Sequence, residues 1–201
     1  MKRIYIAIAL LGVLLLAACG RDRLAVELKG SWSGAPEHLV AEGIPSATIT
    51  PVYTFYNDAD SLAEQGEVTI AAMISAMVPD AASDQDVQPV STSVSGVGTV
   101  SGTWTLSGDR VELTLDPSTI NVNINPSSVV AVENMASQQE TPVVAQISPE
   151  TAAAIARSLS EALKMRFAME TGLDGVSIKG DVMDCSVMDR KIVLHRSMQA
   201  F

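Results

Sequence analysis

The sequence predicts a mainly β protein in which roughly eight antiparallel strands form a single up-and-down barrel, with one long helix before the last hairpin. Three observations support this fold class. Most segments alternate between apolar and polar residues with period two, which is typical of half-buried strands. Turn-forming residues separate these segments, and one segment alone changes to helical periodicity.

The chain begins with a segment typical of an exported bacterial protein. Two basic residues precede an apolar run over residues 4–18, which is too short to span a bilayer comfortably. The run ends in Leu-Ala-Ala before Cys19, and this pattern resembles the lipobox of bacterial lipoproteins. The resemblance implies a signal peptide over residues 1–18 and a lipid on the Cys19 sulfur, with residues 19–23 as a tether. An ordinary secretory signal or a short amino-terminal anchor is the alternative.

A lipid on Cys19 would anchor this protein in a membrane, which is therefore its expected partner. Two or more acyl chains anchor a protein stably. Gly20 follows the cysteine where many enteric bacteria place Asp to retain lipoproteins in the inner membrane, so the outer membrane is expected. The sequence leaves the leaflet and the oligomeric state open. With Cys19 lipidated, Cys185 has no partner for a disulfide, and its apolar neighbours predict burial.

The remaining residues, 24–201, are interpreted as one domain. Gly108 lies between two alternating runs and supplies the positive φ of a tight hairpin. Gly96, Gly98 and Gly102 share one face of a single strand, where glycine marks a bend or a close approach of backbones. The expected strands are 24–33, 47–57, 67–78, 91–106, 110–116, 120–125, 175–184 and 191–196.

One helix is expected between Ser148 and Gly172. Ser148 is a suitable N-cap, Pro149 fits the first turn, and Gly172 stops the helix. Its apolar stripe predicts packing across the sheet or over a barrel end. The polar stretches 79–89 and 133–146 are expected to be loops.

Two Gly-x-Trp motifs, Gly30 to Trp32 and Gly102 to Trp104, occur in expected strands. A Gly-x-Trp near the first strand, followed by further antiparallel strands and one late helix, resembles the lipocalin-like (calycin-type) lipoproteins of bacteria, notably Bacteroidetes. The resemblance implies that Gly30 and Trp32 close one barrel end and that Arg196 lies across the tryptophan. The chain departs from true lipocalins because their Thr-Asp-Tyr signature is missing and the helix precedes the last hairpin.

Composition and motifs exclude several functions. A formal net charge of -10 provides no basic face for nucleic acid. Motifs for zinc hydrolysis, serine nucleophiles and dinucleotide binding are absent from the sequence, so no cofactor, metal or enzymatic activity is expected. A hydrolase remains a third option only if His38 or His195 meets carboxylates or a serine in a cleft.

Binding is the favoured function. An eight-stranded barrel has room inside for side chains or for one small apolar ligand. Tyr53, Phe55, Met73, Met77 and Trp104 are the candidates to line such a cavity, because adaptable methionines and aromatic rings suit apolar ligands. The alternative is a filled barrel with a structural or protein-interaction role in the envelope.

Overall fold

The structure is a computed structural model, and it describes residues 23–57, 64–79, 91–125, 127–134 and 139–198. The signal segment, Cys19 and nearly all of the expected loop 79–89 lie outside the described residues. Within the described residues the chain is mainly β, and the helix α2 covers Pro149–Ala168. No described helix is long and apolar enough to cross a membrane.

The strands belong to one antiparallel sheet of 11 strands. Each pairing in this sheet is antiparallel. The strands are β1 (Gly30–Ser33), β2 (Glu37–His38), β3 (Ser46–Tyr56), β4 (Gln65–Pro79), β5 (Ser91–Ser107), β6 (Arg110–Ile124), β7 (Ser127–Asn134), β8 (Gln139–Gln146), β9 (Gly172–Lys179), β10 (Val182–Val187) and β11 (Arg190–Ser197).

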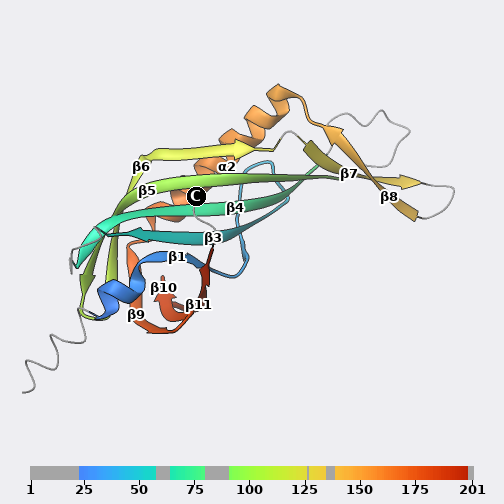
Figure 1. Cartoon of the computed structure of the whole chain (residues 1–201). Helices are drawn as coiled ribbons and strands as arrows, with labels where there is room; N and C mark the ends of the chain where they lie inside the picture. Colours follow the sequence, from blue (N-terminus) through green and yellow to red (C-terminus); the bar gives the residue numbers. More distant parts are fainter. Residues whose placement is uncertain (1–22, 58–63, 80–90, 126, 135–138, 199–201) are drawn as a thin grey trace, which may run out of the picture.

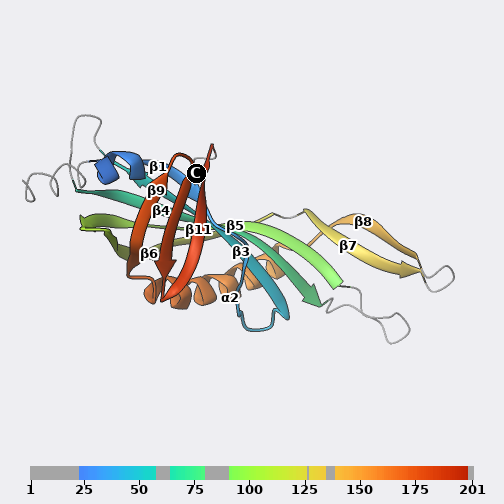
Figure 2. The same cartoon turned by 90° about the horizontal axis from the view of Figure 1, so that it is seen from below.

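Part of this sheet closes on itself. Pairing runs from β3 through β1, β11, β10, β9, β6, β5 and β4 back to β3. The ring closes only partly, since β6 and β9 are joined by two residue pairs, Val111 with Leu173 and Glu112 with Gly172. The strands β1 and β9–β11 form a curled end, while β3–β6 continue beyond it and the β7–β8 hairpin projects from β5 (Figures 1 and 2). The prediction of a mainly β, barrel-like sheet is therefore confirmed at this level.

The helix α2 packs on the inner face of the extended strands (Figure 1). The Ser148 hydroxyl accepts a hydrogen bond from the Thr151 backbone N–H at 3.1 Å, which caps the helix start. Gly98 on β5 leaves the space for this packing, because a Cβ there would lie 2.4 Å from Leu163 Cδ1. The helix residues that are buried are Ile155, Leu159, Ala162, Leu163 and Phe167.

The strand β6 replaces the two strands expected at 110–116 and 120–125. The register between β5 and β6 shifts between Thr99 and Ser101, which accommodates Pro117 within one continuous strand. Thr119 Oγ1 accepts a hydrogen bond from the Ser101 N–H at 2.9 Å, so a side chain replaces a ladder partner at this bulge.

The expected strand at 24–33 is wrong in its first half. Residues 23–28 are helical, and only Gly30–Ser33 form a strand. Arg23 pairs with Glu27 one turn later at 2.8 Å, and Val26, which alternation placed inward, is 58% exposed. Ala25 and Leu28 are fully buried three residues apart, a spacing that shares one face of a helix but would lie on opposite faces of a strand.

Two further boundaries differ from the prediction. Gly180, with φ 62°, turns the chain inside the expected strand 175–184 and divides it into β9 and β10. Three strands therefore follow α2, where one hairpin was expected. The expected loop 133–146 contributes to a hairpin instead, since the backbones of β7 and β8 pair throughout. The β-branched residues of β8, notably Val143 and Val144, favour a strand although Gln is frequent nearby.

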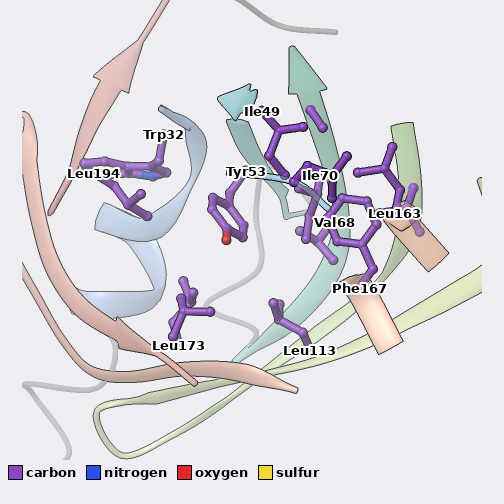
Figure 3. Close-up of a cluster of buried hydrophobic side chains, with 14 of the residues drawn as sticks. Trp32, Ile49, Tyr53, Val68, Ile70, Leu113, Leu163, Phe167, Leu173 and Leu194 are labelled. Carbon is purple, nitrogen blue, oxygen red and sulfur yellow. The ribbon is translucent and has the colours of Figure 1, made fainter. Parts of the chain in front are cut away.

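The core lies inside the curled end and continues under α2. Figure 3 shows buried side chains from β1, β3, β4, β6, α2, β9 and β11 pointing toward one another. The largest fully buried side chains of the core include Trp32, Tyr53, Phe55, Trp104 and Leu194. The ring and the helix therefore share one hydrophobic core.

Candidate functional site

One end of the core is closed by Trp32 and Arg196. The Arg196 guanidinium carbon lies 4.2 Å from the centroid of the Trp32 ring, which is a cation–π distance. Arg196 also donates to the carbonyl oxygens of Lys29 at 2.9 Å and Glu27 at 3.0 Å, and the Trp32 indole N–H donates to the Leu28 carbonyl at 2.7 Å. These bonds satisfy carbonyls at the end of the 23–28 helix.

Glycine is required at position 30 for two reasons. Its φ is +106°, a backbone conformation that residues with a side chain rarely adopt, and a Cβ would lie 3.1 Å from Arg196 Nη1. Gly30, Trp32 and Arg196 thus lie together and pack this end of the core.

The five candidate cavity residues divide between two faces of the sheet. Tyr53, Phe55 and Trp104 are buried inside, with Tyr53 and Phe55 stacked at 6.4 Å between centroids. Phe55 meets Trp104 edge-on at 6.1 Å. Met73 and Met77 pair with Thr50 and Ser46 on the opposite face, and Met77 is 46% exposed.

The two methionines therefore do not line the interior, and this part of the prediction is wrong. Residues of β4 are apolar on both faces, so alternation could not assign the inner face. The register assigns it, because Tyr53 pairs with Ile70 and residues two apart from Ile70 point inward with it. Of the five candidates, Tyr53 alone borders the pocket described next.

A pocket of about 480 Å³ lies between the turn after β1, the strand β3, the end of α2 and the strands β10 and β11. Its apolar lining includes Ala35, Pro36, Pro51, Val187, Ile192 and Val193. Its polar lining includes Glu37, Tyr53, Arg166, Arg190, Lys191 and His195. The volume falls in the usual range for small-molecule sites.

A network of ion pairs forms one wall of this pocket. Tyr53 donates its hydroxyl proton to Glu170 Oε1 at 2.5 Å, and Arg166 Nη1 donates to Glu170 Oε2 at 2.6 Å. Arg166 Nη2 donates to Glu37 Oε1 at 2.9 Å, and Arg190 pairs with the other oxygen of Glu37. The network connects β2, β3, α2 and β11, which are distant in sequence.

Burial sets the electrostatics of this network. The Glu170 side chain is 0% exposed, and burial raises the pKa of its carboxyl although Arg166 opposes that shift. Burial, followed by the charge of Glu170, raises the pKa of the Tyr53 hydroxyl well above 10.0. Burial alone would lower the pKa of Arg166, but Glu170 and Glu37 raise it overall. Arg166 is therefore held charged between two carboxylates.

Sequence reasoning did not find this network. Arg166 lies outside the apolar stripe that the sequence predicts, on the opposite or flanking surface of the helix, and Glu37 and Glu170 carry no motif. Glu37 and Arg166 are separated by 129 positions, so no spacing in the sequence connects them. The available signal was an arginine in the last turn of α2, one helical turn before Glu170.

Other predicted features have separate positions. Cys185 is buried, as its neighbours indicated, and burial raises the pKa of its thiol to about 12. His195 borders the pocket, whereas His38 is exposed on β2. Across the described ranges, no group of three or more His, Cys, Asp or Glu residues could hold a metal ion.

No protein-family model matches this chain, and no curated protein matches it in sequence.

Proposed function

We propose that this protein is a lipid-anchored lipoprotein of the bacterial outer membrane, whose lipocalin-like domain binds a small hydrophobic molecule. The pocket of about 480 Å³ is the observation that carries the binding proposal. The lipobox-like sequence that ends at Cys19 supports the anchor, and the partly closed antiparallel ring supports a lipocalin-like fold.

Mass spectrometry of small molecules that co-purify with the full chain tests the binding proposal. Val193 borders the pocket and is 45% exposed, so Val193→Trp should fill the pocket without disturbing the core. Val40→Trp is the matched control, because Val40 is 77% exposed and does not line the pocket. We expect a bound molecule with the wild type and with Val40→Trp, but a depleted one with Val193→Trp. Equal recovery from both variants would contradict the proposal.

Replacement of Cys19 by serine tests the anchor separately. The Cys19→Ser chain cannot carry a thioether-linked lipid, so it should lose stable attachment to the outer membrane. Fractionation of cells that express either form measures this loss. An unchanged outer-membrane fraction would refute the lipid anchor.

A structural or protein-interaction role is the second candidate. Tyr53, Phe55 and Trp104 pack against one another where an interior ligand was expected, so this part of the core is filled. Under this second candidate no small molecule co-purifies, and Val193→Trp behaves as Val40→Trp does.

A further inference from the structure

The pocket is locally basic in an acidic protein. The formal net charge of the chain is -10, yet Arg166, Arg190 and Lys191 line the pocket against a single lining carboxylate, Glu37. A basic pocket on an acidic chain concentrates favourable potential for an anion at one place.

The three cationic side chains of the pocket differ in how fully protein carboxylates pair with them. Arg166 is held by Glu170 and Glu37. Arg190 gives one of its five side-chain N–H donors to Glu37, and among the described residues no hydrogen bond or ion pair involves the side chain of Lys191. Both oxygens of Glu37 are bonded to arginines, so its negative charge is already compensated. Three cations thus face the two carboxylates Glu37 and Glu170, so the uncompensated positive charge lies at Lys191, and Arg190 adds N–H donors beyond the one that it gives to Glu37.

An apolar surface begins beside these two residues. Lys191 and Val193 lie two positions apart on β11, so they share one face at a separation of about 7 Å. Pro51 and Ile192 add apolar surface to the same pocket. The pocket thus offers a charged end and an apolar wall within the length of a small amphipathic molecule.

We propose that the pocket binds an amphipathic anion, with its carboxylate, sulfonate or phosphate head at Arg190 and Lys191 and its apolar body against Pro51, Ile192 and Val193. This inference rests on the proposed binding function and specifies the chemical class of the ligand. A neutral molecule of the same shape forgoes the charge-assisted hydrogen bonds, and a cation is repelled by the uncompensated charge of Lys191.

Matched eight-carbon probes test the charge preference. Octanoate, octan-1-ol and octylamine share a chain and differ in the head group, and calorimetric titration of the full chain in lipid nanodiscs measures their binding. Empty nanodiscs and the Val193→Trp variant define binding outside the pocket. We expect octanoate to bind at least tenfold more tightly than octan-1-ol, and its affinity to fall as salt is raised.

A lysine substitution identifies the head-group site. Lys191→Gln removes a charge that has no protein partner among the described residues, so the fold should be retained. We expect it to weaken octanoate binding severalfold and to leave octan-1-ol unchanged. Lys179→Gln is the matched control, because Lys179 is exposed on β9 away from the pocket.

The outcomes separate this inference from the proposed function. Equal affinity for octanoate and octan-1-ol, or an equal effect of Lys191→Gln on both, overturns the anionic head group while small-molecule binding stands. If no probe gives a binding signal that is lost in the Val193→Trp variant, both the proposed small-molecule binding and the anionic ligand are overturned. Preference for octanoate that Lys191→Gln removes and Lys179→Gln preserves supports the anionic ligand.

Discussion

Replacement of Arg166 by methionine should strongly destabilise the domain. Methionine retains much of the apolar stem but removes the charge. Glu170 Oε2 then loses the partner that holds it at 2.6 Å, while its side chain remains fully buried. Glu37 keeps Arg190, so the loss falls mainly on Glu170. Removal of one partner of a buried ion pair costs about 3–5 kcal/mol, and we expect a loss of this size in the free energy of unfolding.

The loss in the free energy of unfolding of the Arg166→Met variant should also depend on pH. Arg166 lowers the pKa of the buried Glu170 carboxyl, so the variant carries a carboxyl whose folded pKa is raised further above the ordinary 4.5. Between the ordinary pKa of Glu170 in the unfolded chain and its raised pKa in the folded variant, the folded state binds more protons than the unfolded state. The free energy of unfolding therefore falls as pH rises through that window. The destabilisation by Arg166→Met should therefore be smaller at pH 5.5 than at pH 8.

Urea denaturation followed by tryptophan fluorescence measures both effects, because both tryptophans are buried. Arg157→Met on the exposed side of α2 is the control and should change stability by less than about 0.5 kcal/mol. In the double variant Arg166→Met with Glu170→Gln, the buried charge is gone and the loss should shrink to about 1–3 kcal/mol. A loss below about 1 kcal/mol for Arg166→Met, or a double variant that is less stable than the single one, would refute the reasoning.

Three other substitutions or reactions test separate parts of the fold. Gly98→Ala places a methyl group 2.4 Å from Leu163 Cδ1, so unfolding free energy measured in urea should fall by about 1–3 kcal/mol; an unchanged value would contradict the close packing of α2. Arg196→Met removes the cation over an indole and two bonds to carbonyls, and should lower the melting temperature by several degrees, corresponding to about 2 kcal/mol. Cys185, with a thiol pKa of about 12, should resist iodoacetamide at pH 8 until urea unfolds the chain; rapid alkylation of the folded protein would show that the thiol is accessible.

The parts of this fold that the sequence predicts are those whose signal is carried by residues close together in the chain. Alternation identified strands such as β6, in which the buried Val111 and Leu113 alternate with exposed residues, and Ser148 with Pro149 located the helix start. Alternation failed at residues 23–28, where the apolar spacing fits a helix as well as a strand. It could not orient β4, because that strand is apolar on both faces and its inner face is set by pairing with β3.

The candidate site was the least predictable part because, apart from the Arg166–Glu170 pair one helical turn apart, its contacts have no local signal. Its ion pairs join β2 to the end of α2 and to β11, and these segments meet only after the ring and the helix have packed. Tyr53 was predicted as a cavity residue from its strand face, but its partner Glu170 lies 117 positions away. A charged residue such as Arg166 on a helix is usually exposed to solvent, and only the tertiary structure buries it against two carboxylates.

The role of Arg166 also constrains how a ligand enters the pocket. Arg166 borders the pocket and at the same time neutralises the buried Glu170. A ligand that drew Arg166 away would leave that carboxylate with Tyr53 alone, at a cost comparable to the Arg166→Met substitution. An anion that binds Lys191 and the remaining N–H donors of Arg190 leaves Glu170 paired with Arg166 and leaves Arg190 bonded to Glu37. The fold thus favours a ligand head group at β11 and keeps Arg166 as a fixed part of the wall.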